Sequence, residues 1–264
     1  MLEQPDNSVT EDLDPDPYKD GRPAGPIDDE VIADEQERAP LDPSCPEGID
    51  VSAYQKTVDW PKVAASGRRF AYIRVSYSRT RDSRAASHWD GARQAGLVCG
   101  GYHFFRFHEK SPVEAQVAAF LGMFDDGRPY GPGTLPPAVD LEWDTYGKPL
   151  KTAADRAAYI LAARAWLDGV EARLGIRPVI YTGRMFWKEI GNPLDLAEFG
   201  LWVASVQRAT PRLPSPWSDF LFWQYSHTGQ VPGLTGKVDC NVFRGTPEAF
   251  VDLVVPKNRV ESAS

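Results

Sequence analysis

Eight short apolar runs lie between Gly48 and Phe243, and their spacing limits the fold more than any other feature of the chain. The runs cover 48–52, 70–76, 98–105, 137–143, 178–183, 200–206, 221–226 and 238–243. Segments with a helical pattern separate the first five runs. Alternation of strands and helices is typical of a parallel sheet, and eight strands predict that the sheet closes into an α/β barrel.

The connecting segments predict that this TIM-like barrel is irregular towards its end. Helices are expected over 59–67, 83–96, 111–124 and 152–175, with a closing helix over 246–255. The segments that join the last three strands, 208–219 and 227–237, are too short or too rich in proline for full helices. The final third of the barrel is therefore expected to consist mostly of strands and loops.

The N-terminal segment differs in composition from the rest of the chain. Residues 1–47 contain 15 acidic and 3 basic side chains, whereas the remainder contains 22 and 26. The segment has no apolar periodicity and cannot bury enough apolar surface to offset the entropy lost on ordering. We predict a disordered acidic, Pro-rich tail over 1–46, a barrel domain over 47–257 and a short disordered C-terminus over 258–264. A plain spacer and a delivery or partner-binding segment both fit the tail's composition.

Composition and charge argue against several classes of protein. Cys45, Cys99 and Cys240 are too few for a disulfide scaffold, and no Cys/His cluster indicates zinc. The acidic N-terminus lacks the apolar core of a secretory signal, and no apolar run approaches the ~18 residues of a membrane span. The slightly basic body is weak evidence for any partner class. We expect a monomer without cofactor, metal, nucleic-acid partner or membrane insertion.

The run PPAVDLEW ends on two carboxylates, Asp140 and Glu142. Side chains two residues apart in a strand point to the same face, so these two like charges would lie close together. Such proximity raises one pKa and costs stability. A catalytic pair and a calcium or magnesium site are the two explanations that this cost leaves open.

Other polar and aromatic side chains also lie within or at the end of the apolar runs. They are Asp50, Tyr102, His103, Phe104, Tyr181, Trp202, Trp223, Gln224, Tyr225, Asp239 and Asn241. In α/β barrels the chemistry lies at the C-terminal ends of the strands. Aromatic faces pack on sugar rings, and paired carboxylates cleave glycosidic bonds. Taken singly, each residue has a structural explanation as a cap, a hydrogen-bonded core histidine or a core aromatic.

The ordered motifs GIDVSAYQ, VDWPKVAASG, YHFF, LPPAVDLEW, IYTG, LWVA, FWQYS and VDCNVF resemble those of the family 25 glycoside hydrolases, the muramidase-type lysozymes. The resemblance extends from Gly48 to Phe243. It implies an irregular barrel of the (β/α)5(β)3 type. It also implies cleavage of the β-1,4 bond between N-acetylmuramic acid and N-acetylglucosamine in peptidoglycan.

The resemblance assigns a role to each of four carboxylates. Glu142 is similar to the general acid/base, Asp140 to its partner, and Asp50 and Asp239 to the two other acidic residues of the site. The candidate substrate-binding residues are Tyr102, His103, Phe104, Tyr181, Trp202, Trp223, Gln224 and Tyr225. The segment 76–89 is shorter and richer in arginine than is usual in the family, so Arg79, Arg81 and Asp82 have no assigned role, and Cys240 stands where leucine is common.

Retention of configuration with help from the substrate's N-acetyl group is the expected mechanism, and direct attack by an Asp is its alternative. A wall-binding module without activity and a chitinase-like barrel are the rival functions; the latter carries a longer motif, DxxDxDxE, that this chain lacks. The expected partner is the peptidoglycan glycan strand, with a delivery machine or immunity protein as a further expectation. The chain is expected to be made in the cytoplasm and to act on the wall after lysis, holin-type release or dedicated secretion, as an endolysin or an antibacterial effector.

Overall fold

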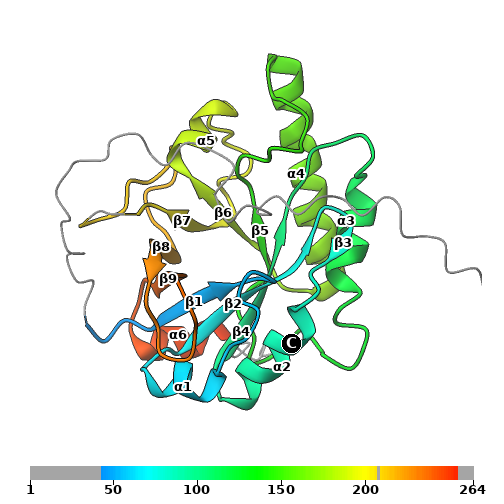
Figure 1. The fold of residues 1–264 in the computed structure, drawn as a ribbon. Coiled ribbons are helices and arrows are strands. Elements are labelled where there is room, and N and C mark those ends of the chain that lie inside the picture. Colours follow the sequence, from blue (N-terminus) through cyan, green and yellow to red (C-terminus); the bar gives the residue numbers. More distant parts are fainter. Residues whose placement is uncertain (1–42, 207–208, 255–264) are drawn as a thin grey trace, which may run out of the picture.

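The computed structural model describes residues 43–206 and 209–254, which form a closed barrel with helices on its outside (Figure 1). The strands are β1 (Glu47–Val51), β2 (Phe70–Tyr77), β3 (Thr80–Arg81), β4 (Val98–Phe104), β5 (Ala138–Asp140), β6 (Val179–Gly183), β7 (Gly200–Ala204), β8 (Phe222–Gly229) and β9 (Val238–Phe243). The helices are α1 (Trp60–Ala65), α2 (Ala85–Gln94), α3 (Val113–Leu121), α4 (Ala153–Leu174), α5 (Arg184–Glu189) and α6 (Pro247–Val254). Residues 1–42 of the predicted tail (1–46) lie outside the described residues. The predicted C-terminal segment 258–264 also lies outside them.

Eight of the strands close the barrel in the order β1-β9-β8-β7-β6-β5-β4-β2, and β2 pairs with β1. Neighbours from β1 through β2 and β4 to β8 are parallel, whereas β9 is antiparallel to both β8 and β1. This arrangement confirms the predicted irregular TIM-like barrel. The two-residue strand β3, which was not expected, forms a hairpin with β2 through a turn in which Ser78 has φ of 49°.

The end of one strand and the presence of one helix differ from the prediction. The strand expected over 137–143 is only three residues long and ends at Asp140, so Glu142 lies in a bend beyond it. The helix α5 follows β6 directly and was not expected from the sequence. It has six residues and no side-chain cap on its first turn, so its local signal is weak.

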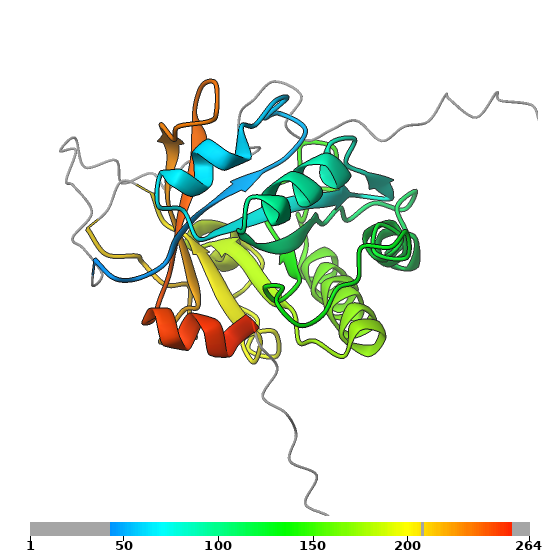
Figure 2. The ribbon, with the colours of Figure 1, turned by 90° about the horizontal axis from the view of Figure 1, so that it is seen from below.

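Two of the helices, α1 and α4, begin where the sequence supplies a side-chain cap, whereas α2 and α3 have none. The Asp59 side chain accepts a hydrogen bond from the Lys62 amide at the start of α1. The long helix α4 begins with a reciprocal capping box between Thr152 and Asp155, and it ends at Gly175, whose φ of 66° suits glycine. Figure 2 shows α2, α3 and α4 following one another along one side of the barrel.

The outer face of β7, β8 and β9 is covered differently. Leu201, Val203, Trp223 and Val242 form a separate apolar cluster on which loop residues Leu213, Trp217 and Phe220 pack. The loop 209–221 therefore takes the place that a helix has elsewhere, as the Pro-rich connection predicted.

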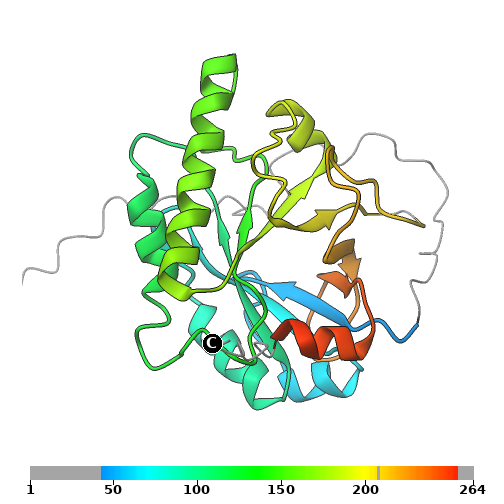
Figure 3. The ribbon, with the colours of Figure 1, turned by 180° about the vertical axis from the view of Figure 1, so that it is seen from behind.

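Aromatic side chains fill the barrel at the end where the parallel strands begin. Tyr72 stacks on Trp202 with ring centroids 4.4 Å apart, and Phe70 contacts Phe222 at 5.4 Å. Helix α6 lies against this end of the molecule, the same end as α1 and α2 (Figure 3), where Phe250 contacts Phe70 at 5.6 Å. The packing closes this end, so an internal site is open to solvent only at the opposite, C-terminal end of the parallel strands.

We expect Phe250→Ala to destabilise the barrel by about 3 kcal/mol, because deletion of a buried aromatic side chain leaves a cavity. Phe250 is 6% exposed, whereas its neighbour Val251 is 55% exposed. Val251→Ala is the matched control and should change the melting temperature little. Equal shifts for the two variants in thermal unfolding would show that α6 does not seal the barrel.

Candidate active site

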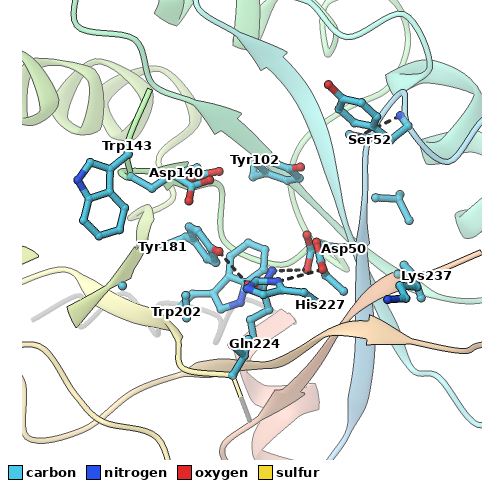
Figure 4. A pocket seen from close by; sticks show the side chains of 18 of the residues that line it. Asp50, Ser52, Tyr102, Asp140, Trp143, Tyr181, Trp202, Gln224, His227 and Lys237 are labelled. Carbon is cyan, nitrogen blue, oxygen red and sulfur yellow. Dashed lines mark hydrogen bonds and ion pairs between the residues drawn. The ribbon is translucent and has the colours of Figure 1, made fainter. Parts of the chain in front are cut away.

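A cavity of about 390 Å³ opens at the C-terminal ends of the parallel strands. Figure 4 shows Tyr102, Tyr181 and Trp202 arranged around the carboxylates of Asp50 and Asp140. The lining residues are Asp50, Val51, Ser52, Tyr54, Gln55, Tyr102, Asp140, Glu142, Trp143, Tyr181, Gly183, Arg184, Met185, Phe186, Trp202, Ala204, Val206, Gln224, His227, Thr235, Lys237, Val238 and Asp239. All four carboxylates singled out in the sequence thus line one cavity.

Asp50 is held by two amide donors. Its Oδ2 accepts hydrogen bonds from Gln224 Nε2 at 2.9 Å and from Asn241 Nδ2 at 2.7 Å. The Tyr181 hydroxyl donates to Gln224 Oε1 at 2.8 Å, and Trp202 Nε1 donates to Asn241 Oδ1 at 2.8 Å. These outer bonds fix both amides with their NH₂ groups towards Asp50, so the carboxylate cannot rotate freely.

The register of β1 and β9 places Asp50 directly opposite Asp239. Directly opposed residues of an antiparallel pair lie on the same face, so two like charges are neighbours there. Burial and the nearby Asp239 raise the pKa of Asp50 to about 7, against the lowering effect of its amide donors and of His227. Asp50 is therefore partly protonated near neutral pH.

Asp140 is 4% exposed, and its Oδ1 has no hydrogen-bond partner within residues 43–206 and 209–254. Burial, followed by the charge of Asp50, raises its pKa well above the ordinary value. A buried acceptor without a donor is costly unless a ligand supplies one. The free oxygen of Asp140 is thus a hydrogen-bond acceptor available to a molecule in the cavity.

A buried ion pair adjoins this carboxylate. Arg74 Nε donates to Asp82 Oδ2 at 2.8 Å, and both side chains are fully buried. The positive charge of Arg74 lowers the pKa of Asp140 and so opposes part of the effect of burial. Asp82, for which the sequence gave no role, also accepts hydrogen bonds from the amides of Ala53 and Arg84. It therefore anchors the segments after β1 and β3 to the charged interior.

Glu142 is half-buried in the loop that follows β5. Burial raises its pKa to about 8, with further increases from Asp239 and Asp144 and a decrease from His227. The loop is fixed beside it, because Arg106 donates to both oxygens of Asp144, at 2.6 and 3.3 Å. On the other side Trp143 Nε1 donates to Glu189 Oε2 at 2.8 Å. Glu142 is thus a protonated carboxyl at neutral pH on a loop held from both sides.

Four of the eight predicted substrate-binding residues line the cavity: Tyr102, Tyr181, Trp202 and Gln224. His103 does not. It is fully buried on the outer side of β4, where it stacks on Trp166 at 5.2 Å and bonds Ser76 at 2.8 Å and Gln116 at 2.9 Å. Burial lowers the pKa of His103 to about 3, so it remains a neutral structural group.

The other three predicted binding residues also lie outside the cavity lining. Phe104 is fully buried between its neighbours. Trp223 packs in the outer cluster and donates through Nε1 to the Ser205 carbonyl at 2.7 Å. Tyr225 packs on Trp223 with ring centroids 6.0 Å apart. Trp143 and Phe186, in contact at 5.5 Å, are cavity aromatics that the sequence analysis did not assign to the site.

His227 is the most informative residue that sequence reasoning missed. Strict alternation from Gln224 would place Ser226, and not His227, on the inner face of β8. Register shifts between Gln224 and Ser226 and between Ser226 and Gly229 change this alternation. His227 consequently lines the cavity, where its Nδ1 lies 3.1 Å from Asp239 Oδ1.

The family model of glycosyl hydrolases family 25 matches residues 49–234. The chain belongs to this family, as the sequence motifs indicated, and the match decides against a chitinase-like barrel. It is a glycoside hydrolase of the muramidase, or lysozyme, class, which acts on peptidoglycan.

Individual relatives agree with this assignment. The chain is 33% identical over 231 residues to Lysozyme M1 of Streptomyces globisporus, covering 83% of this chain and 75% of that protein. It is 33% identical over 213 residues to an N,O-diacetylmuramidase of Arthroderma benhamiae, covering 75% and 82%. The crystal structure of a bacterial lysozyme from Streptomyces coelicolor superposes with a TM-score of 0.69 at 30% identity, covering 81% of this chain and 98% of that one.

Two further features concern the described residues only. No group of three or more His, Cys, Asp or Glu side chains there is arranged to hold a metal ion. No helix in the same ranges has the length and apolar character needed to cross a bilayer.

We expect Glu142→Gln to stabilise the fold increasingly as pH rises. The folded pKa of about 8 lies above the unfolded value of 4.5, so the folded state retains a proton that the unfolded chain loses. The contribution of Glu142 to the free energy of unfolding of the wild type is largest below its unfolded pKa. This contribution is lost as pH rises to its folded pKa. The melting temperature of the variant relative to wild type should increase from about pH 5 to about pH 8 and then level off.

Glu109→Gln, which changes an exposed residue outside the cavity, is the control for this series. Its melting temperature should follow the wild type at every pH. A constant difference between Glu142→Gln and wild type over the same range would contradict the raised pKa of Glu142.

Proposed function

We propose that this chain hydrolyses the β-1,4 bond between N-acetylmuramic acid and N-acetylglucosamine in peptidoglycan, with Glu142 as general acid and base. The observation that carries the proposal is a carboxyl with a pKa of about 8 in an aromatic-walled cavity. A glycosidic oxygen leaves poorly unless it is protonated, and Glu142 retains its proton at neutral pH.

Asp140 is assigned to the substrate's acetamido group. Its Oδ1 is an available acceptor, and an acetamido N–H is a donor of matching chemistry. This hydrogen bond would turn the acetamido oxygen towards the anomeric carbon. That oxygen forms the new bond to the carbon while the glycosidic C–O bond breaks and the leaving oxygen takes the proton of Glu142.

The second half of the reaction reverses the role of Glu142. A water molecule attacks the anomeric carbon, and the bond to the acetamido oxygen breaks. The anomeric carbon is inverted twice, first by the acetamido oxygen and then by water, so the configuration is retained, and Glu142 regains its proton from that water. Direct attack by an Asp is the alternative mechanism, and in Asp50 it would fall to Oδ1, since Oδ2 already accepts two amide hydrogen bonds.

Asp50 and Asp239 are the other two acidic residues that line the cavity. Asp50 is fixed by its amide donors, so its carboxyl is oriented before substrate arrives, and its ionised form can stabilise a developing positive charge. Tyr102 and Tyr181 supply aromatic surface for sugar rings, whereas Trp202 is 1% exposed and stacks on Tyr72. A binding module without activity would have no need for four acids in one cavity, since like charges cost stability.

The cellular setting stays a prediction. An endolysin and a secreted antibacterial effector both suit a wall hydrolase, and so do release by lysis, a holin-type pore or dedicated secretion. A delivery or immunity partner stays a prediction in the same sense.

We expect Glu142→Gln to fold normally and to reduce wall hydrolysis by ~10²- to 10⁴-fold, because the proton donor is lost. The measurement is the clearing of purified cell walls, followed by identification of the new reducing end, which should be muramic acid. Glu109→Gln is the control for the substitution chemistry. Near wild-type turnover by Glu142→Gln would refute the assignment, and retained wall binding without hydrolysis in the wild type would support the binding-module alternative.

We also expect hydrolysis to survive EDTA. If Asp140 and Glu142 formed a calcium or magnesium site, the cation would supply the compensating charge and chelation would destabilise the fold. The test is wall hydrolysis and a melting curve with and without EDTA. If activity disappears on chelation and returns with added calcium or magnesium, the assignment of Glu142 as general acid is refuted.

A further inference from the structure

His227 lines the cavity, and neither the family motifs nor the proposed chemistry uses it. It lies on β8, its side chain is 33% exposed, and its Nδ1 is 3.1 Å from Asp239 Oδ1. Figure 4 shows it next to Gln224 and Asp50. An imidazole at hydrogen-bond distance from a carboxylate, inside a cavity lined by four acids, changes the charge of that cavity when it gains or loses a proton.

Acidic groups face His227 from three parts of the barrel. Asp239 lies on the neighbouring strand β9, Asp50 lies on β1, and Glu142 lies on the loop after β5. All three raise the pKa of His227 above 6.5, although burial acts in the opposite direction. Conversely, the charge of His227 lowers the pKa of both Asp50 and Glu142.

The other cationic side chains at the cavity are placed differently. Lys237 and Arg184 line it but are exposed to solvent, which screens their charge. Arg74 is fully buried and is already paired with Asp82. Within the described residues, His227 is therefore the partly buried cationic group in the cavity that Asp50 and Glu142 also line.

We propose that His227 is a positioning residue of the hydrolytic site: its imidazolium, held by Asp239, supplies the positive charge that balances Asp50 and Glu142 and sets the pH range of hydrolysis. The proposal rests on the assignment of Glu142 as proton donor. It makes this chain's pH range depend on a side chain that enters the cavity only because of the irregular register of β8.

The direction of the effect follows from charge. A cation favours the ionised form of a nearby carboxyl, so removal of His227 favours the protonated forms of both Asp50 and Glu142. Loss of the Glu142 proton ends activity at high pH, and protonation of the partner carboxylates ends it at low pH. Both limits of the pH–rate profile should therefore move to higher pH when the imidazolium is absent.

The first experiment measures His227 in the full-length wild-type protein without an activity assay. The chain has four histidines, so imidazole NMR signals are few, and His227→Asn identifies the signal of His227 by its loss. We expect this imidazole to titrate above 6.5 and to titrate lower in Asp239→Asn. A wild-type value at or below 6.5, or a value unaffected by Asp239→Asn, would overturn the proposal.

The second experiment compares pH profiles of wall hydrolysis for wild type and His227→Asn. Asparagine keeps a neutral donor near the position of Nδ1, so it separates the charge from the hydrogen bond. Both limits should rise, by roughly 1 pH unit, as expected for loss of an opposite charge at close range. A rate lowered equally at every pH, or limits that do not move, would show a structural role only.

Two controls separate the possible failures. His108→Asn changes a histidine outside the cavity whose Nδ1 accepts from the Lys110 amide, and its profile should match the wild type. Near wild-type turnover by Glu142→Gln would refute the proposed function while leaving the NMR result for His227 valid. An unchanged imidazole titration in Asp239→Asn, together with loss of activity in Glu142→Gln, would refute only the role of His227.

Discussion

The antiparallel strand β9, inserted between β1 and β8, is the constraint on which the site depends. It is the one strand of the described barrel that runs against its neighbours, and its register decides which side chains meet inside. Asp50 is set opposite Asp239, and Gln224 is set opposite Asn241. A single register therefore produces both the repulsion between two acids and the pair of amides that oppose it.

In one half of the site the side chains are fixed by hydrogen bonds, and in the other half a buried oxygen has no hydrogen-bond donor. Around Asp50 every amide orientation is fixed by a further hydrogen bond, from Tyr181 or from Trp202. Asp140, by contrast, has a buried oxygen without a partner. Unpaired polar groups and like charges lower stability, and proteins retain such costs mainly where function needs them. This difference between the two halves supports the proposal that the reacting part of the substrate lies beside Asp140 and Glu142.

The alternation of residues in strands explains which parts of the site could be predicted from sequence. The eight apolar runs predicted the barrel, and the acids at the strand ends predicted the cavity. Three consecutive residues cannot all face inwards, however. Once Tyr102 faces the cavity, His103 must face the helices, and once Gln224 faces it, Trp223 and Tyr225 must face outwards. Strict application of this period to the sequence would have excluded His103, Trp223 and Tyr225.

His227 and Trp143 could not be found in the same way. His227 enters the cavity through irregular register in β8, and Trp143 lies on a loop held by a distant ion pair between Arg106 and Asp144. Bulges and loop anchors depend on contacts between segments far apart in the chain, so no local pattern encodes them. The same reason explains why the end of β5 before Glu142 was misplaced.

The closure by β9 has a consequence for the synthesis of the chain. Asp50 and Asn241, which are hydrogen-bonded across the β1–β9 seam, are 191 residues apart in sequence. A ribosome that adds 5–20 residues per second makes β9 roughly 10 to 40 seconds after β1. Throughout that time the nascent barrel lacks the strand that carries Asp239 and Asn241, and for most of it Asp50 lacks both amide donors, because Gln224 lies 174 residues after it. The candidate site thus comes together only after β9 has been made, so a nascent chain that ends before β9 carries an incomplete cavity.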